Sequence, residues 1–177
     1  MARKYGKDEA KLNYNAELRR LKQQGPARLY LLWGPEDYLR EQYLQQLKAV
    51  CLPEGEDSFS YKRMDGPELD YMVLQNALDA MPFMTERTLV EIRDADLNKL
   101  KEPEKLIKIL SDIPDYCTVV FVQSAQYELD GRLKLIKGLK GIATELKFTQ
   151  ASQGMLIDWI IRRFAAAGKS VELDAAQ

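Results

Sequence analysis

The sequence predicts an α/β fold of three layers, in which a mainly parallel five-stranded sheet lies between two layers of helices. Three observations predict it. Short apolar segments alternate with longer segments of helical period over most of the 177 residues. Residues 117–122 form an unbroken apolar run, as a central strand covered on both faces requires. The connections are short, and strands that alternate with helices are joined by right-handed crossovers into a parallel sheet.

Each of the five expected strands has an apolar or alternating pattern. Residues 29–33 are apolar throughout, which is typical of a strand buried on both faces. The segment before Asp65 alternates instead, and its apolar positions include Phe59 and Tyr61. The predicted strands cover residues 29–33, 58–64, 88–92, 117–122 and 143–148.

Helices are expected where apolar residues recur every three or four positions. The first follows Asn15, a favourable N-cap residue, and ends at Gly25 and Pro26. The predicted helices cover 16–24, 39–50, a segment that starts at Asp65-Gly66-Pro67 and runs to about Ala80, a segment from Pro103 to about Ile113, 131–139 and a segment from Ser152 to Gly168. The inner face of the third is predicted at Leu69, Val73, Ala77 and Ala80, with a second stripe at Leu74, Leu78 and Met81.

The last predicted helix does not fit the alternation of strands and helices. No sixth strand follows it, so its apolar face needs a partner outside this chain. We therefore expect three parts: a tail and short helix over 1–27, an α/β domain over 28–150, and the first helix of a small helical lid domain over 151–177. On this interpretation the chain is a fragment of a longer protein.

Composition excludes several function classes. Hydrophobic residues make up 46% of the chain and charged residues 30%, with a net charge of −1, as in a soluble globular protein. Histidine is absent, which excludes catalysis and metal binding by imidazole. The two cysteines lack metal-binding spacing, and no apolar run is long enough for a membrane span or signal peptide. We expect a cytoplasmic protein.

The segment after the first predicted strand has the position of a phosphate-binding loop but not its residues. Such a loop has the pattern G-x-x-x-x-G-K-[ST]. Counted from Gly34, no second glycine follows, Arg40 takes the place of the lysine, and Glu41 that of the hydroxyl. Glu36 and Asp37 add negative charge at a helix N-terminus that would otherwise attract phosphate. The sequence therefore predicts no nucleotide cofactor and favours a structural or partner-binding role.

Polar residues that follow two other strands have familiar positions. In an active P-loop ATPase, an acidic pair where Asp94 and Asp96 stand would hold the water bound to Mg²⁺, and Ser124 would be a polar sensor. Without a phosphate loop, we interpret all three as cap or turn residues. No nucleophile, base and oxyanion site come together, so we expect no catalytic residue and no metal.

Two large apolar residues, Phe83 and Met84, follow the third predicted helix. Pro82 disfavours the helical conformation at Met81, so the helix ends there. Phe83 and Met84 then lie in a connection flanked by polar residues. Either both fold back onto the edge of the sheet, or they are exposed and enter a hydrophobic pocket of another protein. The residues alone leave both interpretations open.

Several motifs follow one another in an order that is found in one known family. The opening segment, residues 26–39, ends in W-G-P-E-D-Y-L directly after a strand. The later motifs are residues 80–84 with Arg87, Arg93-Asp94, 118–121, 130–132 with Lys134, and Trp159-Ile160 followed by 167–169. With these motifs the chain resembles the delta subunit of the bacterial DNA polymerase III clamp loader from about Leu18 to its end.

The resemblance implies an AAA+-like first domain that does not bind ATP, a helical lid, and a collar that joins the tau/gamma and delta prime subunits. It implies a non-catalytic subunit of the polymerase III holoenzyme that binds the β sliding clamp and helps open it for loading onto primed DNA. The family's apolar contact pair corresponds to Phe83 and Met84, with Met81 beside it. The collar is absent from this sequence, so we do not expect stable assembly into the loader.

Two other functions remain open. The first is a degenerate nucleotide-binding enzyme or regulator in which Asp94 and Asp96 are metal ligands. The second is a DNA-binding replication module that uses the lysines of one helix face, Lys134, Lys137 and Lys140.

Overall fold

The computed structural model describes residues 14–56, 59–83 and 85–149, together with 157, 160, 161, 164, 165, 168 and 169. Five strands form one sheet in the order β2-β3-β4-β1-β5. Every pair of neighbouring strands is parallel, which confirms the predicted fold class. The strands are β1 (Leu29–Trp33), β2 (Tyr61–Asp65), β3 (Thr88–Arg93), β4 (Cys117–Val122) and β5 (Thr144–Lys147).

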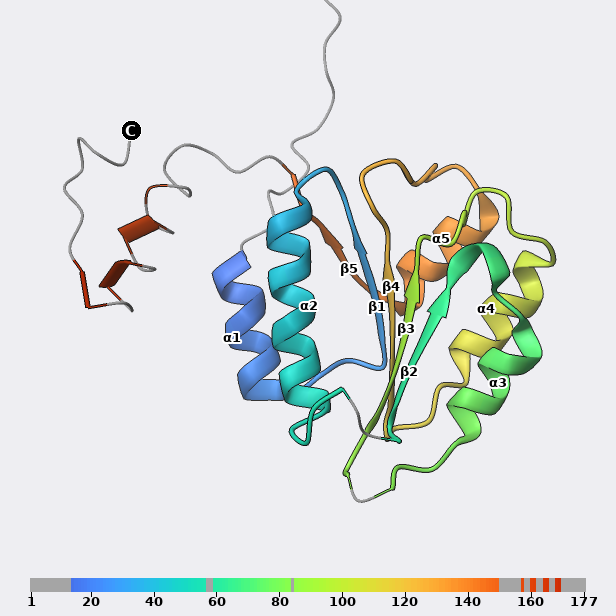
Figure 1. Cartoon of the computed structure of the whole chain (residues 1–177). Helices are drawn as coiled ribbons and strands as arrows, with labels where there is room; N and C mark the ends of the chain where they lie inside the picture. Colours follow the sequence, from blue (N-terminus) through green and yellow to red (C-terminus); the bar gives the residue numbers. More distant parts are fainter. Residues whose placement is uncertain are drawn as a thin grey trace, which may run out of the picture.

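Helices cover both faces of the sheet, which gives the three layers seen in Figure 1. One layer consists of α1 (Tyr14–Gln24) and α2 (Asp37–Cys51). The other consists of α3 (Tyr71–Asp79), α4 (Pro103–Ser111) and α5 (Lys134–Ile142). A short 3₁₀ helix, η1 (Gly66–Glu68), connects β2 to α3. Among the helices described, none has both the length and the apolar character that a membrane span needs.

Two hydrophobic clusters lie on the two faces of the sheet. Successive side chains of a strand point to opposite faces, so Tyr30 packs toward α1 and α2 whereas Leu31 packs toward α3, α4 and α5. Every residue of β1 and β4 is buried. This explains why these two strands are continuous apolar runs in the sequence.

The predicted inner face of α3 was wrong. Leu74 and Leu78 are buried, whereas Val73 is 46% exposed. The helix begins after Asp70, whose carboxylate accepts hydrogen bonds from the N–H groups of the second and third residues of the helix. This cap fixes the start of the helix and leaves Leu69 outside it. Leu74 and Leu78 of the second predicted stripe therefore face the sheet, whereas Met81, its third member, follows the helix and is 80% exposed.

Other element boundaries also differ from the prediction. Strand β2 begins at Tyr61 and not at residue 58, so Phe59 precedes it. Helix α1 begins by Tyr14, so Asn15 lies inside it, and α5 begins at Lys134 and not at residue 131. Most of the helix predicted after Ser152 lies outside the described residues. The division into residues 1–27, 28–150 and 151–177 therefore stays a prediction.

We expect Gly66→Ala to destabilise the protein by about 3 kcal/mol, at the upper end of the cost of overpacking. A Cβ at Gly66 would lie 2.1 Å from the backbone N and Cα of Ala95, and backbone atoms cannot rotate away as a side chain can. Urea unfolding measures the free energy. Gly131→Ala is the control, because a Cβ there meets nothing within 4 Å. Equal stability of the two variants would contradict the close packing of η1 on the β3–α4 connection.

Candidate functional site

The connection between α3 and β3 exposes apolar side chains at the amino end of the sheet. Met81 is 80% exposed and Phe83 is 63% exposed. The alternative in which Phe83 folds back onto the sheet edge is therefore wrong. Met84, the third predicted contact residue, lies outside the described residues. We call Met81 and Phe83, together with Phe59, the apolar corner.

Phe59 belongs to this corner although it comes from a different segment. Its side chain is 93% exposed, and its ring lies edge-on to that of Phe83 with the ring centres 6.2 Å apart. Sequence reasoning assigned Phe59 to a strand, because its alternation with Tyr61 is that of a strand. No local signal distinguishes it from a strand residue.

A chain of hydrogen bonds fixes the backbone of the apolar corner. The N–H of Phe83 donates to Ser60 Oγ at 3.4 Å, and the Ser60 and Thr85 hydroxyl oxygens are 2.5 Å apart. The Thr85 hydroxyl donates to the carbonyl of Arg87, so the Ser60 hydroxyl is the donor to Thr85. The α3–β3 connection is therefore tied to the residue before β2, while its apolar side chains point outward.

The loop after β1 lies at the other, carboxyl end of the sheet and is closed against β5. Gly34 has φ +117°, and a Cβ there would lie 2.3 Å from the carbonyl oxygen of Phe148. The N–H of Glu36 donates to that same carbonyl at 3.1 Å, and the N–H of Phe148 donates to Trp33 O at 2.7 Å. The amide of Glu36 therefore bonds to the residue that follows β5, whereas in a phosphate loop such amides point toward the phosphates.

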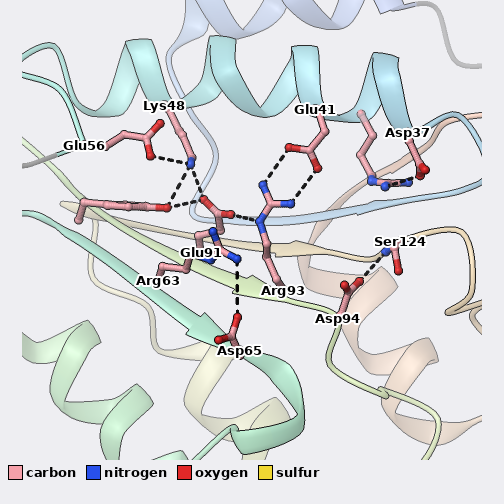
Figure 2. Close-up of polar contacts among 12 residues, drawn as sticks. Asp37, Glu41, Lys48, Glu56, Arg63, Asp65, Glu91, Arg93, Asp94 and Ser124 are labelled. Atoms are coloured by element: carbon pink, nitrogen blue, oxygen red, sulfur yellow. Dashed lines mark hydrogen bonds and ion pairs between the residues drawn. The ribbon is translucent and has the colours of Figure 1, made fainter.

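Both residues at the key positions of a phosphate loop bond within the chain. The buried Arg40 guanidinium donates to the Gly34 carbonyl at 2.7 Å and to Asp37 at 2.5 Å. The Glu41 carboxylate accepts two hydrogen bonds from Arg93, at 2.9 and 2.8 Å. Figure 2 shows the Arg93–Glu41 pair between β3 and α2.

The Arg93–Glu41 pair is one end of an ion-pair network centred on Glu91, whose side chain is fully buried. The Glu91 carboxylate contacts Lys48 Nζ at 2.7 Å, accepts from the Tyr61 hydroxyl at 2.7 Å, and also accepts from Arg93. Burial by itself would raise the pKa of Glu91, but these three hydrogen bonds outweigh it and hold the pKa below its usual value. Sequence reasoning missed this network; the available signal was a glutamate inside an apolar strand.

The carboxylates considered as metal ligands have other partners. Asp94, at φ +55°, accepts a hydrogen bond from the backbone N–H of Ser124 at 2.7 Å and so joins the ends of β3 and β4. Asp96 pairs with Lys99 at 3.0 Å. Within the described residues, no three acidic, cysteine or histidine side chains are placed to hold a metal ion. The geometry matches the interpretation of Asp94 as a turn residue.

The basic face considered for DNA is partly neutralised by its own neighbours. Lys134 pairs with Glu104 at 3.0 Å, and Lys140 pairs with Glu145 at 3.0 Å. The Lys140 ammonium also lies 5.8 Å from the centre of the Trp33 ring. These contacts leave α5 with less free positive charge than its sequence indicates.

We expect Glu91→Gln to lower the free energy of unfolding by about 3 kcal/mol at pH 7, because it leaves Lys48 with a buried charge that has lost its closest partner. Since the pKa of Glu91 is lowered in the folded state, its contribution is present above about pH 4.5 and is lost as the pH falls further. Urea unfolding at pH 7 and pH 3.5 should therefore show a smaller acid-induced loss for the variant.

Glu104→Gln is the control for this substitution, because the Glu104–Lys134 pair is exposed to solvent and such pairs contribute little to stability. A similar small loss of unfolding free energy in both variants at pH 7 would show that the network does not depend on Glu91.

Comparisons with solved structures find a similar fold in a DNA clamp loader protein and in two other proteins. The DNA clamp loader delta protein YqeN of Bacillus subtilis matches with a TM-score of 0.73 and 22% identity, over 92% of this chain and 50% of that one. A DNA polymerase III gamma subunit-related protein of Thermotoga maritima matches with a TM-score of 0.53 and 13% identity, over 89% and 54%. A variant of RuvB from Thermotoga maritima matches with a TM-score of 0.50 and 20% identity, over 92% and 52%.

These matches show the AAA+-like fold, and this chain spans about half the length of each. No curated protein matches the chain in a sequence comparison. The family model described as DNA polymerase III, delta subunit, matches residues 30–149, which is most of the chain and includes β1 to β5. The chain therefore belongs to the DNA polymerase III delta subunit family.

Proposed function

We propose that this chain is the clamp-binding part of a clamp-loader delta subunit. Its contact residues are Phe83 and Met84, with Met81 beside them, and its partner is the β sliding clamp. The observation that carries the proposal is the exposure of Met81 and Phe83 on a connection held by hydrogen bonds. Large apolar side chains gathered on a fixed surface are typical of a protein-binding site.

Burial in a pocket of the partner would provide the affinity. Each such side chain contributes about 1.5–3 kcal/mol when it is fully buried, so the pair can anchor a complex. A connection that is already fixed loses little conformational entropy on binding, which increases the net gain. We infer that the bound subunit favours the opened interface of the clamp ring over the closed one and in this way assists loading onto primed DNA.

We further propose that the chain hydrolyses no ATP and that other subunits of the loader, tau/gamma and delta prime, supply that energy to the full-length protein. The ion pairs of Arg40 and Glu41 support this proposal. A nucleotide at the loop after β1 would have to displace the Arg40–Asp37 and Arg93–Glu41 pairs. It would also have to bind beside the carboxylates of Glu36 and Asp37. Contact of the chain with DNA is indirect on this account.

We expect the double variant Phe83→Ala, Met84→Ala to lose binding to the purified β sliding clamp, because both proposed anchors are removed. Surface plasmon resonance with immobilised clamp measures the affinity, and circular dichroism checks that the fold is intact. Met72→Ala is the matched control, because Met72 is 73% exposed but lies at the start of α3, away from the apolar corner. Wild-type affinity in the double variant would disprove the assignment.

Isothermal titration calorimetry with ATP and Mg²⁺ should show no binding at millimolar nucleotide. The same measurement on a Glu41→Thr variant should also show none, because a hydroxyl alone does not restore the glycine and lysine of a phosphate loop. Micromolar binding by the wild-type chain would overturn the non-catalytic assignment in favour of a nucleotide-binding regulator.

A further inference from the structure

Phe59 is the most exposed of the large apolar side chains that the structure describes, and the fold does not use its ring. It belongs to neither hydrophobic cluster. The neighbouring Ser60, in contrast, is 3% exposed and holds the backbone of the α3–β3 connection. Ser60 therefore fixes the segment, and Phe59 is free to serve a surface function.

The contact that the Phe59 ring makes is with Phe83. The two rings are perpendicular, at an interplanar angle of 90°, with centres 6.2 Å apart. This edge-to-face arrangement is one of the two that aromatic pairs prefer. It restricts the rotation of the Phe83 side chain, which on its own would sample several rotamers on an open surface.

The apolar surface continues from this pair toward the edge of the sheet. Phe59 also lines a shallow groove of about 300 Å³ between β2 and α3, together with Val73, Ala77 and Ala80. The lining side chains of α3 that face this groove are mainly small and apolar. The surface around Phe83 therefore extends beyond the α3–β3 connection, and Phe59 joins the connection to the groove.

We propose that Phe59 and Phe83 act as one aromatic pair in binding the β sliding clamp, with Phe59 as the positioning residue for the Phe83 ring. The inference rests on the proposed function, since it assigns a second segment of the chain to the same surface. Phe59 holds the ring of Phe83 in an outward rotamer before binding. The clamp then meets a preorganised side chain and less conformational entropy is lost.

The test is a double-mutant cycle on the whole chain, with affinity for purified β clamp measured by surface plasmon resonance. Phe59→Ala should weaken binding about tenfold, which corresponds to the cost of immobilising one unrestrained side chain, that of Phe83, on binding. Phe59→Tyr should keep wild-type affinity, because a tyrosine ring offers the same edge contact. In a Phe83→Ala background, Phe59→Ala should change the affinity less than about threefold, since its partner is gone. Thermal unfolding should be the same for all variants, because Phe59 is outside both clusters.

The outcomes separate this inference from the function on which it rests. Absence of binding between the wild-type chain and the clamp would overturn the clamp-binding function itself, and unchanged affinity in Phe83→Ala would overturn the assignment of Phe83 to the contact. Loss of affinity in Phe83→Ala with wild-type affinity in Phe59→Ala would overturn the aromatic pair alone. Equal effects of Phe59→Ala with and without Phe83 would also overturn it, because independent contacts are additive.

Discussion

The buried carboxylate of Glu91 is the constraint on which the carboxyl end of this sheet depends. It lies fully buried between β3 and α2, and it is stable there only because Lys48, Tyr61 and Arg93 bond to it. Arg93 in turn holds Glu41 on α2. Glu41, which stands at the hydroxyl position of a phosphate loop, is thus part of the ion-pair network that joins α2 to β3. The carboxyl end of the strands, where open α/β sheets generally bind ligands, is occupied here by the protein's own charges.

The strands of the parallel sheet run from the amino end, which we propose for partner binding, to the carboxyl end, which is closed by ion pairs. Connections that follow strands lie at the carboxyl end, and those that precede strands lie at the amino end. The apolar corner precedes β2 and β3, so it lies at the amino end, opposite the end of the sheet at which α2 begins (Figure 1). A rigid α/β body holds the corner in place, and hydrogen bonds through Ser60 fix its backbone. A surface fixed in this way loses little conformational entropy when a partner binds.

The sequence predicts those structural elements that are determined by residues close together in the chain. Strands β1 and β4 are predicted correctly, because burial on both faces requires residues that are apolar almost throughout; Thr118 is the exception. The buried face of α3 is predicted wrongly, because two apolar stripes compete and the packing of Leu74 and Leu78 on the sheet decides between them. The Glu91 network and the Phe59–Phe83 contact join residues distant in the chain, and no local pattern encodes such pairs. The exposure of the Phe83 side chain likewise depends on how its connection is held against the segment before β2, and the residues next to Phe83 in the sequence do not indicate it.

The central claim is that a partner meets the amino end of the sheet while the carboxyl end stays closed. Amide hydrogen exchange followed by mass spectrometry, with and without the β sliding clamp, tests both halves in one measurement. The account predicts slower exchange in the clamp complex for peptides that cover residues 59–65 and 81–88, and unchanged exchange for peptides that cover 34–41. Protection of residues 34–41 or of α5, with the apolar corner unchanged, would contradict it.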